Sequence, residues 1–398
     1  GPIGRPLGMA PFHHYWLRRR QAGHNESLWD YSLNARAAKA GRFDRITQVG
    51  GGYLEGLVYA FHFDAALYAQ YLRRYSEAQG VTRVEGRIVG VDQNPESGFV
   101  TGLTLQDGRK VGGEFFIDCS GFRGLLIEET LKSGYEDWRA WLPMDSAIAV
   151  PCASVTPLTP YTRATAHGAG WQWRIPLQHR TGNGHVFCSD HIDATQATDV
   201  LMANLDGAPL AEPRQLRFTT GRRKQFWNRN VVALGLASGF MEPLESTSIH
   251  LVQSALSRLL ALFPDRGFNP VEIAEYNRQT ALEYEYIRDF LVLHYKATTR
   301  EDTPFWRAVR RMETPDSLKA RIALFSQSGR LFSQDDDLFK EASWIQVLIG
   351  QGVIPEAFHP LTGVVTGAQL DEYLANLRQI MSRAVEVLPS HGDFIAKN

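Results

Sequence analysis

The sequence predicts a mixed α/β fold to about residue 260, followed by a mostly helical region. Three observations lead to this prediction. Short runs of alternating or β-branched residues recur between positions 87 and 236. From about residue 245, apolar residues recur at helical spacing instead. No internal repeat, linker or low-complexity tract separates the two patterns, so we expect regions 1–260 and 261–398 to share one core.

The composition is that of a globular protein. Of the 398 residues, 44% are hydrophobic, and 42 Lys and Arg balance 43 Asp and Glu. This balance, without a basic block, argues against nucleic acid as a partner. No apolar run approaches the ~20 residues that a membrane-spanning helix needs, so we expect no membrane insertion. The odd count of three cysteines argues against a disulfide framework and favours a cytoplasmic location.

The first elements follow an aromatic and basic stretch. Residues 12–20 indicate a loop that leads into a helix. If this stretch is extended, the adjacent His13 and His14 point in opposite directions, and no ligand cluster joins them, so we predict no metal site. Residues 63–78 predict a helix with Asp64 as its N-cap, ended by a glycine.

The next part of the chain is predicted to form strands. Residues 87–91 and 99–105 favour strands, and Asp107-Gly108 indicates a hairpin before residues 114–118, which read as a buried strand. Residues 146–220 predict a further sheet in which Trp171 and Trp173 share one face of a strand. Residues 231–236 predict another apolar strand. The basic run 222–224 is expected at the surface.

Helices are predicted for the remainder. Apolar residues recur at helical spacing from Ile249 until Pro264 ends the run, and residues 276–295 and 370–387 have the pattern of amphipathic helices. The acidic run 335–337 is expected to be a solvated loop.

One strand–loop–helix segment, residues 230–249, carries the clearest chemical signal. A helix is predicted to begin between Ser246 and Ser248, and its free N–H groups and dipole would favour an anion. Glu245 lies at the mouth of that site, where a carboxylate can cap a helix or act as a base. An ordinary capped helix explains the same pattern, and the residue types alone leave both interpretations open.

Three motifs then point to a family. Glu-Pro-Leu-Glu-Ser-Thr at 242–247 resembles the hallmark of flavin-dependent tryptophan halogenases. Gly-Trp-Gln-Trp-Arg-Ile-Pro at 170–176 is similar to that family's Trp-x-Trp-x-Ile-Pro motif, and residues 118–127 resemble a strand and turn of its flavin domain. The motifs follow the family's order, so the resemblance extends over nearly the whole chain.

The resemblance implies roles at the start of the predicted helix. Glu245 stands at the family's catalytic glutamate, which stabilises and deprotonates the cationic intermediate of aromatic halogenation. Thr247 and Ser248 stand where backbone N–H groups bind the halide. The family commonly has glycine in place of Ser248, and a backbone-mediated site tolerates that difference.

The resemblance also implies residues that contact the flavin and residues that line a passage beside it. Leu236 and Ile249 match flavin-contacting positions, and Ile88 does so on the weaker basis of a generic apolar strand. Trp171 and Trp173 match residues along a passage that separates the flavin from the aromatic substrate. Two tryptophans on one strand face also fit a packed core, and both interpretations are compatible.

The substrate region departs from the enzymes that act on tryptophan. Their carboxy-terminal Asn-Tyr-Tyr-type segment is replaced here by residues 339–352, which resemble an indole-accepting branch. Phe339 is predicted to stack on an indole-type substrate. Equally, Phe339 and Trp344 could be only core residues.

The implied activity is electrophilic halogenation by FADH2, dioxygen and chloride or bromide. A separate flavin reductase would supply the FADH2, and a homodimer is possible in this family. The alternatives are a flavin monooxygenase that hydroxylates an aromatic, or a truncated, non-catalytic remnant.

The resemblance also implies a fold like that of FAD-dependent monooxygenases, with a Rossmann-type FAD domain beside a substrate sheet. Two parts of it have no match here: the Gly-x-Gly-x-x-Gly loop of the first βαβ unit, and the catalytic lysine. We therefore expect about a hundred amino-terminal residues, with that βαβ unit, to be missing. The chain alone is then expected neither to hold FAD well nor to halogenate, and to expose apolar surface.

Overall fold

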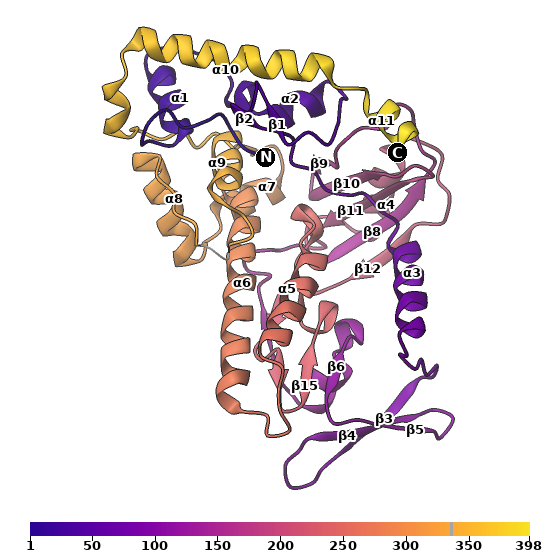
Figure 1. Ribbon diagram of the computed structural model, residues 1–398. Helices are drawn as coiled ribbons and strands as arrows, with labels where there is room; N and C mark the ends of the chain where they lie inside the picture. The colour runs from indigo at the N-terminus through magenta and orange to yellow at the C-terminus, as the bar shows by residue number, and fades with distance from the viewer. Residues whose placement is uncertain (335–336) are drawn as a thin grey trace.

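A computed structural model describes residues 1–334 and 337–398 (Figure 1). Residues 335 and 336 of the acidic run lie outside this part of the chain. The third aspartate, Asp337, is buried at 5% exposure, so the predicted solvated loop is wrong at that position.

The amino-terminal segment forms helices and one short hairpin: α1 (Phe12–Gln21), α2 (Leu33–Lys39), β1 (Gln48–Val49), β2 (Leu54–Glu55) and α3 (Ala65–Ala78). α1 begins directly after Pro11, so the expected loop over its first residues is wrong. Burial of the consecutive side chains 12–17 stabilises the helix there. His13 and His14 consequently do not point in opposite directions, and their ring centroids lie 4.1 Å apart.

α3 confirms the predicted N-cap but has no buried face. Asp64 Oδ1 accepts hydrogen bonds from the N–H groups of Ala66 (2.9 Å) and Leu67 (3.3 Å). None of the residues of α3 is buried, and Leu67 and Tyr71 are 58% and 56% exposed. In Figure 1 the helix stands apart from the other helices, beside the strands.

The predicted sheet between residues 146 and 220 is confirmed as five antiparallel strands in the order β12-β8-β11-β10-β9. Their bounds are β8 (Ser146–Cys152), β9 (Arg163–His167), β10 (Gly170–Pro176), β11 (Thr181–Phe187) and β12 (Arg214–Arg217). Helix α4 (Ala194–Ala203) packs against β8 and β11.

Three small sheets contain the remaining strands: β3 (Ile88–Gln93), β4 (Val100–Leu105) and β5 (Lys110–Gly112); β14 (Trp227–Asn228), β15 (Val231–Ala233) and β6 (Phe116–Asp118); and β16 (Gly239–Phe240), β13 (Gly221–Arg223) and β7 (Tyr135–Asp137). The hairpin between β4 and β5 confirms the Asp107-Gly108 turn. β6 and β15 are parallel. β6 is an edge strand whose Ile117 is 45% exposed, so the predicted full burial of this strand is wrong.

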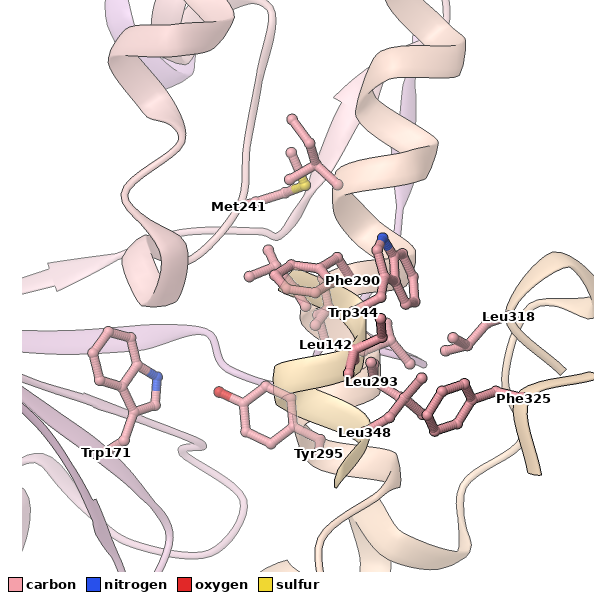
Figure 2. Close-up of a cluster of buried hydrophobic side chains, with 14 of the residues drawn as sticks. Leu142, Trp171, Met241, Phe290, Leu293, Tyr295, Leu318, Phe325, Trp344 and Leu348 are labelled. Atoms are coloured by element: carbon pink, nitrogen blue, oxygen red, sulfur yellow. The ribbon is translucent and has the colours of Figure 1, made fainter. Parts of the chain in front are cut away.

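The carboxy-terminal part is helical, as predicted: α5 (Ser248–Ala261), α6 (Pro270–Lys296), α7 (Pro304–Arg311), α8 (Asp316–Ser328), α9 (Glu341–Gly350), α10 (Gly367–Val387) and α11 (His391–Lys397). α10 lies along α2 at the top of Figure 1. One hydrophobic cluster takes in residues from α1 to α10 (Figure 2). Residues on both sides of position 260 therefore pack together, and the proposed boundary at 260 stays a prediction.

The basic run 222–224 is mostly interior. Arg222 is 7% exposed and its guanidinium lies 3.1 Å from Glu136 and 2.9 Å from Glu285. Arg223 is 4% exposed. The prediction of surface charge is wrong for these two arginines because carboxylates from other elements pair with them inside the fold.

None of the helices in the described residues is long and apolar enough to span a membrane.

Candidate functional site

The segment after β15 forms a tight series of turns. Gly235 has a positive φ of +61° and opens the 3-10 turn η4 (Gly235–Ala237). A second 3-10 turn, η5 (Pro243–Glu245), follows, and Ser246 then adopts φ +54°. A left-handed serine costs about 1–2 kcal/mol and persists only where its surroundings impose it. The strained residue therefore lies between Glu245 and the first turn of α5.

α5 begins without a side-chain cap. Its N-cap residue, Thr247, makes no side-chain bond to the first-turn N–H groups, and Thr247 is 3% exposed whereas Ser248 is exposed. The first N–H groups of a helix have no intrahelical partner, and the helix dipole adds positive potential there. The structure thus brings Thr247 and Ser248 to an uncapped helix start that suits a small anion.

Glu245 pairs with a histidine that the sequence reasoning missed. Its Oε1 lies 2.9 Å from Nε2 of His294 on α6. The other ring nitrogen, Nδ1, lies 2.8 Å from the carbonyl oxygen of Phe290. A carbonyl oxygen only accepts, so Nδ1 donates to Phe290 and Nε2 faces the Glu245 carboxyl. His294 belongs to no motif, and only its distance from Glu245 in the fold reveals the pair.

Trp171 and Trp173 share one face of β10, as predicted. Their ring centroids lie 6.0 Å apart. Opposite Trp173 on β11 stands Gly184, where a Cβ atom would lie 2.0 Å from the Trp173 ring, so only glycine leaves room for that indole. Trp171 is 4% exposed, and its Nε1 donates a 2.7 Å hydrogen bond to Oε2 of Glu242.

Glu242 is the second residue that sequence reasoning left without a role. It has no exposed surface, and Tyr295 OH also donates to its Oε2, at 2.7 Å. Burial raises the pKa of Glu242 to about 7, against the opposing effect of these two hydrogen bonds and the charge of His294. Burial and the neighbouring Glu242 raise the pKa of Tyr295 well above its ordinary value.

The three residues predicted to contact a flavin are not all placed together. Leu236, in η4, and Ile249, in the first turn of α5, are 39% and 49% exposed, and η4 contacts α5. Two exposed apolar side chains beside a helix start fit a flat, apolar ring system. Ile88 lies in β3, in a different sheet at the lower end of Figure 1. Its assignment to the cofactor stays a prediction.

Phe339 lies just before α9 and stacks on Phe290, with ring centroids 4.0 Å apart and an interplanar angle of 24°. Phe290 also accepts the hydrogen bond from His294, so Phe339 reaches the Glu245 pair through one intervening residue. Trp344 is 3% exposed and donates to the Phe339 carbonyl. The contacts suit a core residue and a substrate platform equally, so the role of Phe339 stays a prediction.

The described residues contain no group of three or more His, Cys, Asp or Glu able to hold a metal ion. His13 Nε2 lies 2.7 Å from the carbonyl oxygen of Gly329. Burial, followed by the nearby positive groups, lowers the pKa of His14 to about 3.

Comparison with known proteins assigns this geometry to a family. A family model described as tryptophan halogenase matches residues 1–367. The chain is 32% identical to a tryptophan 6-halogenase of Streptomyces albogriseolus, over 97% of this chain and 76% of that protein. It is equally identical, at 32%, to a tryptophan 7-halogenase of Lentzea aerocolonigenes, over the same shares.

Solved structures agree. A flavin-dependent halogenase from Xanthomonas campestris superposes with a TM-score of 0.95 at 49% identity, covering 100% of this chain and 79% of that one. A flavin-dependent halogenase from Brevundimonas gives a TM-score of 0.97 at 46% identity, covering 100% and 81%. The expectation of a missing amino-terminal unit stays a prediction.

Proposed function

The chain belongs to the tryptophan halogenase family, and from this premise we propose that it is a flavin-dependent halogenase acting on an indole-type aromatic. One observation carries the proposal: the Glu245–His294 pair stands directly before the uncapped start of α5. A general base and an anion site are thereby adjacent on one turn. Halogenation of an aromatic ring needs both.

The halide site is proposed at the backbone of Thr247 and Ser248. Backbone N–H groups bind chloride or bromide without regard to side-chain identity, so the serine in place of a glycine does not prevent binding. The buried Thr247 would shield the ion from water on one side.

Glu245 is proposed to remove the ring proton. As hypohalous acid reacts, the bond between halogen and oxygen breaks and the oxygen leaves as hydroxide. A bond between halogen and aromatic carbon forms, and the ring proton passes to the Glu245 carboxylate and from there to the hydroxide. Halogenated aromatic and water are the products. The contact from Nε2 of His294 would orient the Glu245 carboxyl.

FAD is the cofactor that the family implies. When bound, reduced FAD with dioxygen supplies the oxidising power that converts halide into hypohalous acid. Leu236 and Ile249 are proposed to contact its ring system, and Ile88 a more distant part. We propose that a separate flavin reductase provides the reduced cofactor.

Trp171 and Trp173 are proposed to wall the passage between cofactor and substrate. A packed indole wall keeps the aromatic substrate away from the oxidant and gives halogenation in place of direct hydroxylation. Phe339 is proposed to stack on the substrate ring, next to Phe290, whose ring also contacts His294.

The test is a turnover assay of the protein as its source produces it, with indole, bromide, FAD and a flavin reductase. We expect a product whose mass spectrum shows the bromine isotope doublet. A product with one added oxygen would indicate a hydroxylating monooxygenase, and no product would indicate a non-catalytic protein. Either of those two outcomes overturns the proposal.

Replacing Glu245 by Gln should lower turnover roughly a hundredfold or more, because the amide cannot accept the ring proton. FAD affinity should stay within about twofold of the parent value. Glu386→Gln, on the exposed surface of α10, is the matched control and should leave turnover unchanged. Undiminished turnover in Glu245→Gln would rule out its role as the base.

A further inference from the structure

The carboxyl of Glu242 accepts hydrogen bonds from two donors, one indole N–H and one phenol O–H. Trp171 donates from β10 and Tyr295 from α6, each at 2.7 Å and both to the same oxygen, Oε2. Figure 2 shows the indole nitrogen of Trp171 and the hydroxyl oxygen of Tyr295 facing one another. The carboxyl of Glu242 therefore joins β10 to α6 through one atom.

The other oxygen of Glu242 has no hydrogen-bond partner in the described part of the chain. A buried carboxyl with an unpaired oxygen costs free energy, whether it is ionised or protonated. The unpaired oxygen therefore does not add to the stability of the fold. A role other than stability accounts for a glutamate at this position.

The position of Glu242 relative to Glu245 gives that role. The two carboxyls lie three residues apart on one turn, and two consecutive residues of α6 bind them: Tyr295 holds Glu242, and His294 holds Glu245. The same contact that fixes the Trp171 indole therefore also fixes the turn that carries Glu245. Contacts with α6 therefore fix the Trp171 indole and the Glu245 carboxyl relative to each other.

We propose that Glu242 is a positioning residue that holds the Trp171 indole against Tyr295 and thereby fixes the passage wall relative to Glu245. This inference rests on the proposed halogenase function. Without the carboxyl of Glu242, the buried Trp171 indole N–H loses its 2.7 Å acceptor and keeps only the neighbouring Tyr295 hydroxyl, so the side chain can relax to another rotamer. Hypohalous acid would then escape the passage or react elsewhere.

The first test does not depend on activity. The indole N–H resonances of the 15N-tryptophan-labelled protein are recorded, and the Trp171 signal is assigned by its loss in Trp171→Phe. In Glu242→Leu we expect this signal to move upfield and its hydrogen exchange to accelerate roughly tenfold or more, because the hydrogen bond to the carboxyl is gone. In Glu242→Gln, whose amide oxygen still accepts, the signal should remain near its parent position.

The second test measures coupling, as halogenated indole formed per dioxygen consumed. Glu242→Leu should lower this ratio roughly tenfold to a hundredfold, as misplaced reacting groups do. Glu242→Gln should restore most of it. Tyr295→Phe keeps the Trp171 bond and should give an intermediate value.

Leu318→Ala, in the buried face of α8, is the control for simple destabilisation. It should lower thermal stability while leaving the coupling ratio near the parent value. An unchanged Trp171 resonance in Glu242→Leu, or an equal loss of coupling in Leu318→Ala, overturns the positioning role. If the Trp171 resonance responds as expected but the parent protein makes no halogenated indole, the proposed function fails and the positioning contact stands.

Discussion

α3 and α6 were both predicted as helices from the sequence, but they have opposite environments. In α6 every residue from 287 to 293 is buried, and the helix runs through the largest hydrophobic cluster. In α3 no residue is buried, although apolar side chains recur along one face. The comparison teaches that periodicity identifies a face that can be buried, while the elements packed around a helix decide whether it is.

The largest expected effect is a matched pair of truncations on these two helices. Leu291→Ala in α6, at 0% exposure, should lower the free energy of unfolding by about 2–5 kcal/mol because it leaves a cavity. Leu67→Ala in α3, at 58% exposure, should change it by about 0.5 kcal/mol or less. Urea unfolding of both variants measures the difference. An equal cost in the two variants would show that α3 is covered in solution.

The second prediction concerns a buried carboxyl beside α6. Burial raises the pKa of Glu242 to about 7 from the ordinary 4.5, so the folded protein keeps a proton that the unfolded chain has released. The stability from this proton is full below pH 4.5 and is lost as the pH rises through about 7. A glutamine at position 242 does not titrate, so the variant loses no stability in this way. Relative to the parent, Glu242→Gln should therefore gain up to about 3 kcal/mol over this range.

Unfolding free energies measured at several pH values test this prediction. The other titratable groups that face Glu242 are His294 and Tyr295, and Glu245 pairs with His294. All three remain in the variant, so their own titration contributes to both curves. Glu386→Gln, on the exposed surface of α10, should follow the parent curve. Parallel curves for Glu242→Gln and the parent would contradict the raised pKa.

The smallest expected effect concerns the N-cap of α3. Asp64 caps this helix and also lies 2.7 Å from the Arg180 guanidinium, which, with the capping bonds, lowers the pKa of Asp64 to about 2. With no buried side chain, α3 relies on this cap and contact. Asp64→Ala should accelerate amide exchange in α3 roughly fivefold, because the helix loses its N-cap. Exchange in α6 should not change, and a shared response would contradict the separation of the two helices.

Much of the fold was predictable because its signals are local. The cap at Asp64, the hairpin at Asp107-Gly108 and the strand carrying Trp171 and Trp173 depend on residues within a few positions of one another. The arginines of β13 were misjudged for the opposite reason. Glu285, which pairs with Arg222, is 63 residues away, and no local pattern reports such a partner.

The candidate site likewise contains some residues that the sequence located and others that it did not. The turn containing Glu245, Thr247 and the start of α5 was located from the sequence, because a glycine-bearing loop and a helix start are local features. Glu242 and His294 were not. Glu242 is 71 residues from Trp171 and 53 from Tyr295, and its orphaned oxygen exists only when these groups are packed together.

Local patterns along the chain therefore predicted the order of the elements, the family and the turn that carries the proposed base. Which faces are buried, which carboxyl has a raised pKa and which residues of α6 hold the turn became visible only in the folded molecule. The difference lies in how far apart in the sequence the interacting residues are. Helix caps, turns and strand alternation act over a few residues, whereas burial, desolvation and ion pairing depend on groups that only the folded chain brings together.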